Sequence, residues 1–178
     1  MTAAESIDRR FWSPVRRQRW GVMLAVAAAA SAYASLASWS DGHVFLVNQS
    51  TSLPSWAFLV ERHRLPARGD TIFFDPPASR LLERHFGRDH PPFGKVVYGI
   101  AGDKVTRRGR LFLVNGRAVA LAKEQTLRGE PLALGPTGIV PRGCYFVGTP
   151  NKDSFDSRYA LIGWVCGRQL IGVGKAIL

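Results

Sequence analysis

Hydrophobic and polar positions divide the chain into one long apolar run followed by many short apolar segments. Residues 20–39 contain no charged side chain. A helix of that length spans about 30 Å, the thickness of the hydrocarbon core of a bilayer. Trp20 and Trp39 stand at its ends, where amphipathic rings favour the membrane interface. The pattern predicts a transmembrane anchor over residues 20–39.

Basic residues just before the apolar run predict its orientation. They are Arg9, Arg10, Arg16, Arg17 and Arg19. Positive charge is retained on the cytoplasmic side of a membrane. We therefore expect a cytoplasmic basic tail at residues 1–19 and an outer domain at residues 40–178. In a bacterium this describes a single-pass protein of the inner membrane with its domain in the periplasm.

The apolar segment can be interpreted as an uncleaved anchor or as a leader that is cleaved off, and the sequence leaves both interpretations open. Eight of the residues between Trp20 and Trp39 are alanine, so the segment is only modestly hydrophobic. Ala30-Ser31-Ala32 resembles the small-residue site at which signal peptides are cut. A buried helix of a soluble protein is the weakest alternative, because it gives the upstream arginines no role.

The outer domain reads as a succession of short strands separated by Gly-rich and Pro-rich turns. The expected strands are Val44–Val47, Trp56–Glu61, Thr71–Phe74, Lys95–Ile100, Val105–Arg107, Leu111–Val114, Arg117–Ala120, Cys144–Val147 and Ile162–Cys166. Asn115-Gly116 supplies the positive φ of a tight hairpin turn. Leu81, Leu82 and Phe86 could form one or two amphipathic turns within a polar loop. The pattern predicts a mainly β, barrel-like or coiled-sheet domain.

Composition and net charge limit the kinds of binding partner that we expect for this chain. The chain has 178 residues, enough for one domain of ordinary size, and a net charge of +11. A basic surface suits nucleic acid, a membrane surface or an acidic partner. A domain outside the cytoplasm rarely meets nucleic acid, so we expect none. A solvated basic face is favoured over a specific site for anionic lipid.

Cysteine and histidine give no sign of a metal centre. The two cysteines do not form a Cys-x-x-Cys pair, and the four histidines lack ligand spacing. We expect neither a metal nor a cofactor. Cys144 and Cys166 fall on neighbouring strands, and a disulfide and two buried thiols both remain open.

Three segments combine residues that carry chemistry. They are residues 48–54 (NQSTSLP), 93–105 (FGKVVYGIAGDKV) and 148–159 (GTPNKDSFDSRY). In this order, behind an anchor, they resemble the conserved boxes of bacterial type I signal peptidases. The small size and the run Ser-Phe-Asp-Ser-Arg-Tyr look most like the TraF-type branch, which processes pilins in conjugative transfer. This resemblance implies a coiled β-sheet fold shared with LexA-like peptidases.

The resemblance also implies roles for individual residues. Ser52 would be the nucleophile and Lys95 the general base, and Ser50 would help to stabilise the oxyanion. Ser154 would supply a hydroxyl that orients the lysine. Asp156 and Arg158 would form a supporting ion pair, and Asp153 is a second acidic candidate in the same box.

The chemistry of a serine–lysine pair is consistent with the residues around Lys95. A serine hydroxyl needs a base, and a lysine serves only when its amine is neutral. Phe93, Val96 and Val97 are apolar neighbours, and burial among such groups lowers a lysine pKa. Lys104 is less suitable because it follows Asp103 and lies near further cations.

Two positions depart from the family pattern. Ser55 stands where the TraF-type branch usually has glycine, which leaves the loop geometry and substrate width open. Val96 stands where general signal peptidases often carry arginine, which favours the specialised branch.

We therefore expect a membrane-anchored serine endopeptidase. The resemblance implies a conjugative pilin precursor as its substrate, with cyclisation of that subunit as an added reaction. It also implies the inner membrane and conjugative type IV secretion components as partners. A general type I signal peptidase and a non-enzymatic scaffold of a secretion complex are the alternatives.

Overall fold

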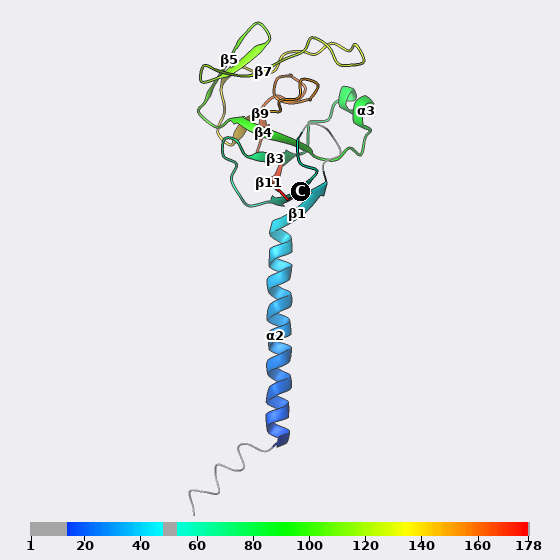
Figure 1. The fold of residues 1–178 in the computed structure, drawn as a ribbon, viewed down its shortest axis with the longest axis vertical. Helices are drawn as coiled ribbons and strands as arrows, with labels where there is room; N and C mark the ends of the chain where they lie inside the picture. Colours follow the sequence, from blue (N-terminus) through cyan, green and yellow to red (C-terminus); the bar gives the residue numbers. More distant parts are fainter. Residues whose placement is uncertain (1–13, 48–52, 178) are drawn as a thin grey trace, which may run out of the picture. The chain divides into compact units, whose positions relative to one another are not determined.

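The structure is a computed structural model that describes residues 14–47 and 53–177. The chain divides into two compact units, with the boundary between Gly42 and His43. The first contains a single described helix, and the second contains the described strands (Figure 1).

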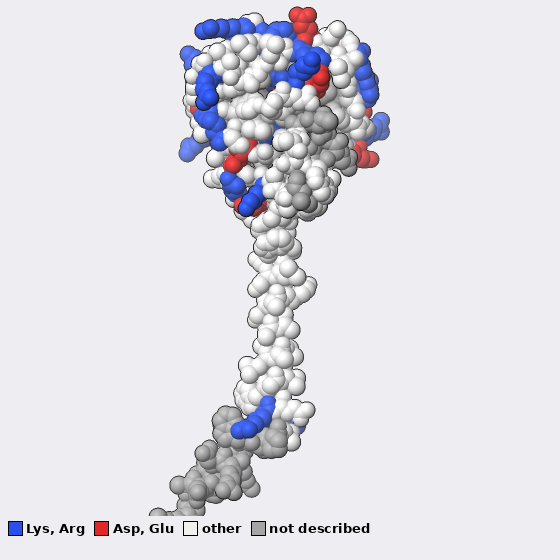
Figure 2. All heavy atoms as spheres, viewed as in Figure 1, with Lys and Arg blue, Asp and Glu red and all other residues white. Residues whose placement is uncertain are grey.

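The first unit is the helix α2, Pro14–Gly42, which has 29 residues. The most apolar window within Val15–Gly42 has a mean hydropathy of 1.6 and is not buried, so by length and composition this helix can cross a membrane. The middle of α2 carries no charged side chain (Figure 2). Among the described residues, α2 is the one helix that meets these criteria, and it contains residues 20–39.

The second unit is built on two antiparallel sheets and one short helix. The order of strands is β1-β2-β11-β3-β4-β9-β10 in the larger sheet and β7-β6-β5-β8 in the smaller. The strands are β1 His43–Val47, β2 Ala57–Glu61, β3 Thr71–Phe74, β4 Phe93–Gly99, β5 Lys104–Arg108, β6 Leu111–Val114, β7 Arg117–Leu121, β8 Gly138–Ile139, β9 Cys144–Gly148, β10 Val165–Cys166 and β11 Leu170–Ala176. The prediction of a mainly β domain is confirmed.

Local sequence signals account for several of these elements. The hairpin of β6 and β7 turns at Asn115 and Gly116, whose φ angles are 50° and 79°, as the Asn-Gly pair predicted. The helix α3, Arg80–Phe86, supplies the expected amphipathic turns and buries Leu82. Ser79 caps its first turn by accepting a hydrogen bond from the amide of Leu81.

The structure corrects the strand assignment at several places, and it adds the two-residue strand β8. β4 begins at Phe93 rather than at Lys95, and β10 is limited to Val165–Cys166. The sequence pattern also missed β11, which pairs with both β2 and β3 inside the larger sheet. Gly172 and Gly174 weaken the strand signal of this segment, since glycine has low strand propensity.

The two sheets approach one another at the end of β4. A methyl group at Gly99 would lie 3.2 Å from Phe146 and 3.5 Å from Val114 and Val140, so glycine lets the layers close there. The main core extends on both sides of this contact. A smaller cluster of Leu53, Phe58, Val60 and Phe73 packs elsewhere on the larger sheet. Strand β4 contributes side chains to both clusters and carries the candidate site.

Candidate active site

Lys95 is buried in the interior of the β domain. Exposure alternates along β4, and Lys95 takes a buried position with only 5% of its surface exposed. Phe93 and Val97 point the same way along the strand and are also buried. The lysine therefore stands in a row of apolar side chains, as the sequence around it predicted.

This environment changes the protonation of the amine. Burial lowers the pKa of Lys95 from 10.5 to about 8, because the ammonium form loses its hydration. The Asp156 carboxylate opposes this change and the Arg158 guanidinium adds to it. A substantial fraction of Lys95 is therefore neutral near pH 8 and able to accept a proton.

The Lys95 ammonium has few stabilising contacts. Its Nζ atom lies 5.2 Å from the centroid of the Phe93 ring, a contact that weakly favours the charged form. Within residues 14–47 and 53–177 it makes no hydrogen bond and no ion pair. Desolvation is thus the dominant influence on this amine.

Asp156 and Arg158 form a buried, two-point ion pair. They are 0% and 2% exposed, and Arg158 donates from Nε to Asp156 Oδ1 at 2.8 Å and from Nη2 to Oδ2 at 2.7 Å. Arg158 also donates to the backbone carbonyls of Leu121, Asn151 and Ser154. The pair satisfies both charges and ties the segment after β9 to β7.

A glycine brings this ion pair close to β4. Gly148 stands opposite Val96 in the pairing of β4 with β9. A methyl group at Gly148 would lie 2.7 Å from the Tyr98 ring and 3.6 Å from Asp156 Oδ2. Burial, followed by the Asp156 charge, raises the pKa of Tyr98. Tyr98 and Gly148 belong to the quoted segments but were not singled out; their burial shows only in three dimensions.

Ser154 is buried near the same ion pair. Its side chain is 4% exposed, and among the described residues its Oγ atom is the buried side-chain oxygen that lacks a hydrogen-bond partner. Its carbonyl accepts from Arg158. The structure therefore shows no hydrogen bond between Ser154 Oγ and Lys95, although both groups are buried.

Asp153 occupies a different environment from Asp156. It forms a partly exposed ion pair with Lys123, and this contact holds the pKa of Asp153 below its ordinary value. The two acidic candidates of the 148–159 segment are thus separated: Asp156 belongs to the buried cluster and Asp153 to the surface.

The predicted nucleophile Ser52 and its neighbour Ser50 lie outside the described residues. Leu53, the next residue, is 7% exposed. A methyl group at Gly94 would lie 2.8 Å from Leu53 Cδ1, so the chain that follows Ser52 packs against β4 one residue from Lys95. β9 pairs with β4 only from Val96 onwards, which leaves this end of β4 without a partner on that edge among the described residues.

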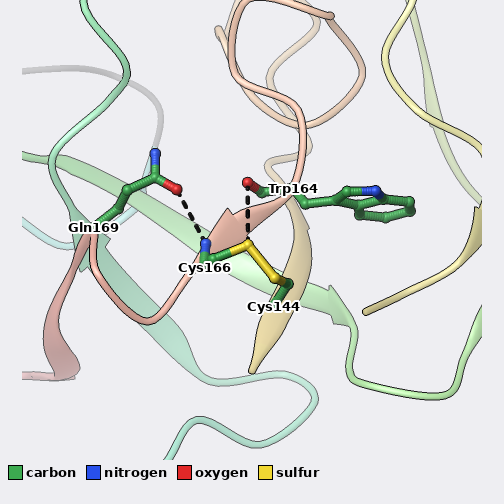
Figure 3. The surroundings of a disulfide bond; sticks show 4 residues. All are labelled: Cys144, Trp164, Cys166 and Gln169. Carbon is green, nitrogen blue, oxygen red and sulfur yellow. Dashed lines mark hydrogen bonds between the residues drawn. A yellow bond between two sulfur atoms is a disulfide. The ribbon is translucent and has the colours of Figure 1, made fainter. Parts of the chain in front are cut away.

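A disulfide closes the segment that carries Ser154, Asp156 and Arg158. Cys144 and Cys166 face each other across β9 and β10 and are joined (Figure 3). The amide of Cys166 donates to Gln169 Oε1 at 3.1 Å. Of the two alternatives left open by the sequence, the structure has the disulfide. Closing a loop of this length lowers the conformational entropy of the unfolded chain, which stabilises the folded state by about 3 kcal/mol.

The described residues offer no alternative metal chemistry. Residues 14–47 and 53–177 contain no group of three or more potential metal-binding His, Cys, Asp or Glu side chains. His85 is engaged by Glu130, with 2.7 Å between Nε2 and Oε2. Among the described residues, the buried Lys95 has a lowered pKa that suits proton transfer.

Comparison with known proteins identifies the family. The model described as signal peptidase, peptidase S26, matches residues 17–178. The chain belongs to the signal peptidase family. This membership makes it a serine-peptidase-type hydrolase, and with the mainly β domain it confirms the predicted fold class.

Individual relatives of this chain are 27% to 28% identical to it. The Agrobacterium fabrum protein named conjugal transfer protein TraF is 27% identical over 146 residues, covering 75% of this chain and 81% of its own. A probable conjugal transfer protein TraF of Sinorhizobium fredii is 28% identical over 155 residues and covers 80% of each chain. A signal peptidase I structure from Enterococcus faecalis has 27% identity and a TM-score of 0.39, covering 62% of this chain and 97% of its own.

Proposed function

We propose that this signal peptidase is a membrane-anchored endopeptidase in which Ser52 is the nucleophile and Lys95 the general base. The burial of Lys95, with its pKa lowered to about 8, is the observation that carries the proposal. The position of Leu53 beside Gly94 supports it, because Ser52 precedes Leu53 directly and Lys95 follows Gly94 directly.

The reaction follows from these assignments. The neutral Lys95 amine accepts the Ser52 hydroxyl proton as the serine oxygen bonds to the scissile carbonyl carbon. The Ser52 amide and the Ser50 hydroxyl donate to the developing oxyanion. When the carbon–nitrogen bond breaks, the Lys95 ammonium returns its proton to the departing amine, and an acyl-enzyme remains on Ser52.

The buried cluster supports Lys95 in this scheme. We assign the Ser154 hydroxyl to orient the Lys95 amine, because Ser154 Oγ is buried and its hydrogen-bonding capacity is not used by another described residue. Asp156 and Arg158 hold the segment that carries Ser154. Asp153, at the surface with Lys123, is given no part in the reaction.

The open end of β4 suits an extended substrate. A polypeptide strand can add to the free edge of a sheet through main-chain hydrogen bonds. Near residues 93–95 β4 has β3 on one side and no described strand on the other. A substrate bound along that edge would bring its backbone to the residues that flank Lys95.

The relatives suggest the substrate. Both TraF proteins are named for conjugal transfer, and we propose that this chain processes the precursor of a conjugative pilus subunit. The acyl-enzyme can be resolved by water, which gives a linear product, or by the amino terminus of the pilin, which gives a ring. We propose that it works beside conjugative type IV secretion components.

We further propose the cellular arrangement. Residues 1–19 form a cytoplasmic tail, residues 20–39 cross the inner membrane, and residues 40–178 form the periplasmic peptidase domain. The arginines before the apolar run support this orientation. An oxidising periplasm also agrees with the Cys144–Cys166 disulfide.

The proposal predicts that pilin maturation requires the Ser52 hydroxyl. The intact mass of the candidate pilin is measured from cells that carry the wild-type chain, Ser52→Ala or Thr51→Ala. We expect processed pilin with the wild type and with Thr51→Ala, and unprocessed precursor with Ser52→Ala. A product one water lighter than the linear form identifies cyclisation.

Equal pilin masses in all three strains would contradict the proposed function. If other secreted proteins then kept their leaders in the Ser52→Ala strain, the chain would be a general signal peptidase. If none did, Ser52 would not be a nucleophile and a scaffold role would replace the peptidase.

A further inference from the structure

A hollow opens beside the buried cluster. It has a volume of about 210 Å³ and lies between the helix α3, the irregular segment 123–132 and the segment 152–159. Ser154 is one of its lining residues. Apart from Ser154, the residues that line the hollow have no role in the reaction described above.

Its interior is mainly aromatic and aliphatic. Phe86 and Phe155 meet edge to face with 5.7 Å between their ring centroids, and both line the hollow with Tyr159 and Leu132. Leu127 also lines it and is 79% exposed. An apolar cavity of about 150 Å³ is large enough to hold benzene. The hollow is therefore large enough for one bulky apolar side chain.

The walls are held in place by polar contacts between α3 and the segment 123–132. Glu130 accepts from Arg84 at 3.3 Å and pairs with His85 at 2.7 Å. Arg128 donates to the Arg84 carbonyl at 2.7 Å. Because these contacts span the hollow's two walls, its shape is largely formed before anything enters.

The rim of the hollow carries a surplus of positive charge. Lys123, Lys152 and Asp153 line it. Lys123 is neutralised by Asp153. Lys152 is exposed and has no ion pair within the described part of the chain. A carboxylate next to the apolar group would therefore find a cation at the rim.

A chain of contacts links the hollow to Lys95. The Phe86 ring lies 5.1 Å from the Phe93 ring, and Lys95 Nζ lies 5.2 Å from the Phe93 ring centroid. Ser154, whose Oγ atom is buried and without a hydrogen-bond partner among the described residues, is one of the residues that line the hollow. A group held there is consequently close to the proposed catalytic groups.

We propose that this hollow is a substrate-recognition pocket that takes a bulky apolar side chain of the bound polypeptide, with a neighbouring carboxylate at Lys152. This inference rests on the proposed peptidase function and gives it a substrate preference. The carboxylate can be the chain terminus of the polypeptide or an acidic side chain, since both present the same group to the lysine.

Binding of short peptides to the full-length Ser52→Ala chain in detergent tests the pocket without catalysis. The probes contain 4-fluorophenylalanine and are followed by fluorine NMR: acetyl-alanyl-4-fluorophenylalanine as the free acid and as the amide, and acetyl-4-fluorophenylalanyl-aspartate amide with its asparagine counterpart. We expect each carboxylate peptide to bind about threefold to fivefold more tightly than its neutral counterpart. If the free-acid peptide and its amide show the larger ratio of affinities, the carboxylate is the chain terminus. If the aspartate peptide and its asparagine counterpart show it, the carboxylate is an acidic side chain.

Matched variants locate the binding. Leu127→Ala should weaken every probe about tenfold, because a wall of the pocket is removed. Leu65→Ala, at a residue that is 85% exposed and outside the pocket, should change nothing. Lys152→Gln should remove the preference for a carboxylate, whereas Lys175→Gln on β11 should retain it.

Two results would contradict the proposal that this hollow is a substrate-recognition pocket. One is equal binding by the Leu127→Ala and Leu65→Ala chains, and the other is a carboxylate preference that survives Lys152→Gln. Because binding is measured on a chain without Ser52, the peptidase proposal is judged separately by pilin mass. A pocket that binds these probes in a chain whose Ser52→Ala form still matures pilin would overturn only the proposed reaction.

Discussion

Replacing Lys95 by methionine is expected to abolish peptide-bond cleavage and to make the protein more stable at pH 7. The activity is expected to fall by about 10³-fold or more, because the substitution removes the buried amine that we propose as the general base. Stability rises because methionine fills the same apolar space without an ammonium group. The lowering of the Lys95 pKa from 10.5 to about 8 corresponds to roughly 3 kcal/mol of unfavourable burial of charge.

The size of this stability difference depends on pH. Between pH 8 and 10.5 the unfolded chain binds a proton at Lys95 that the folded chain has released. The free energy of unfolding of the wild type should therefore rise with pH across this window. The Lys95→Met chain lacks this rise, so the two proteins should converge in stability as the pH approaches 10.5.

Denaturant unfolding of the full chain in detergent, at pH 7 and near pH 10.5, measures this difference. Lys175→Met is the control, because Lys175 is exposed on β11. If the Lys95→Met chain were less stable than the wild type at pH 7, the folded protein would stabilise the ammonium form of Lys95. The lowered pKa on which its proposed role as general base depends would then be contradicted.

The second large effect is expected at the buried ion pair. Asp156→Asn removes the charge that compensates Arg158, which is 2% exposed, and leaves an unpaired buried guanidinium. Breaking such a pair typically costs about 3–5 kcal/mol. We expect a correspondingly large fall in melting temperature, whereas Asp89→Asn, at an exposed position of the loop after α3, should leave it unchanged.

The same variant has a consequence for Lys95. Because Asp156 raises the pKa of Lys95 and Arg158 lowers it, loss of the carboxylate should move that pKa below about 8. NMR titration of Lys95 in the folded Asp156→Asn chain measures this change. An unaltered Lys95 titration would show that the ion pair does not act on the amine, even if the melting temperature falls as expected.

The sequence predicted the elements whose signals are local. The Asn115-Gly116 hairpin was predicted because its turn needs two positive φ angles, and the structure has them. The apolar setting of Lys95 was predicted from Phe93, Val96 and Val97, and of these Phe93 and Val97 share its face of β4. Both depend on residues that are close in the chain.

Features that depend on distant partners were not predicted. β11 was missed because the reason for its glycines lies on other strands: a methyl group at Gly172 would lie 2.4 Å from the Glu61 carbonyl oxygen, and one at Gly174 would lie 2.5 Å from the Phe73 ring. Similarly, the sequence could not separate Asp153 from Asp156. Their difference arises from the Lys123 and Arg158 partners that the fold brings to them.

The dependence of kcat/KM on pH, for cleavage of the pilin precursor by the purified full chain in detergent, tests the serine–lysine mechanism most directly. We expect kcat/KM to rise as Lys95 loses its proton, with a midpoint near pH 8, and then to level off. A midpoint at about pH 6.5, the ordinary pKa of histidine, would contradict the role of Lys95 as general base. So would a rate that does not change with pH over this range.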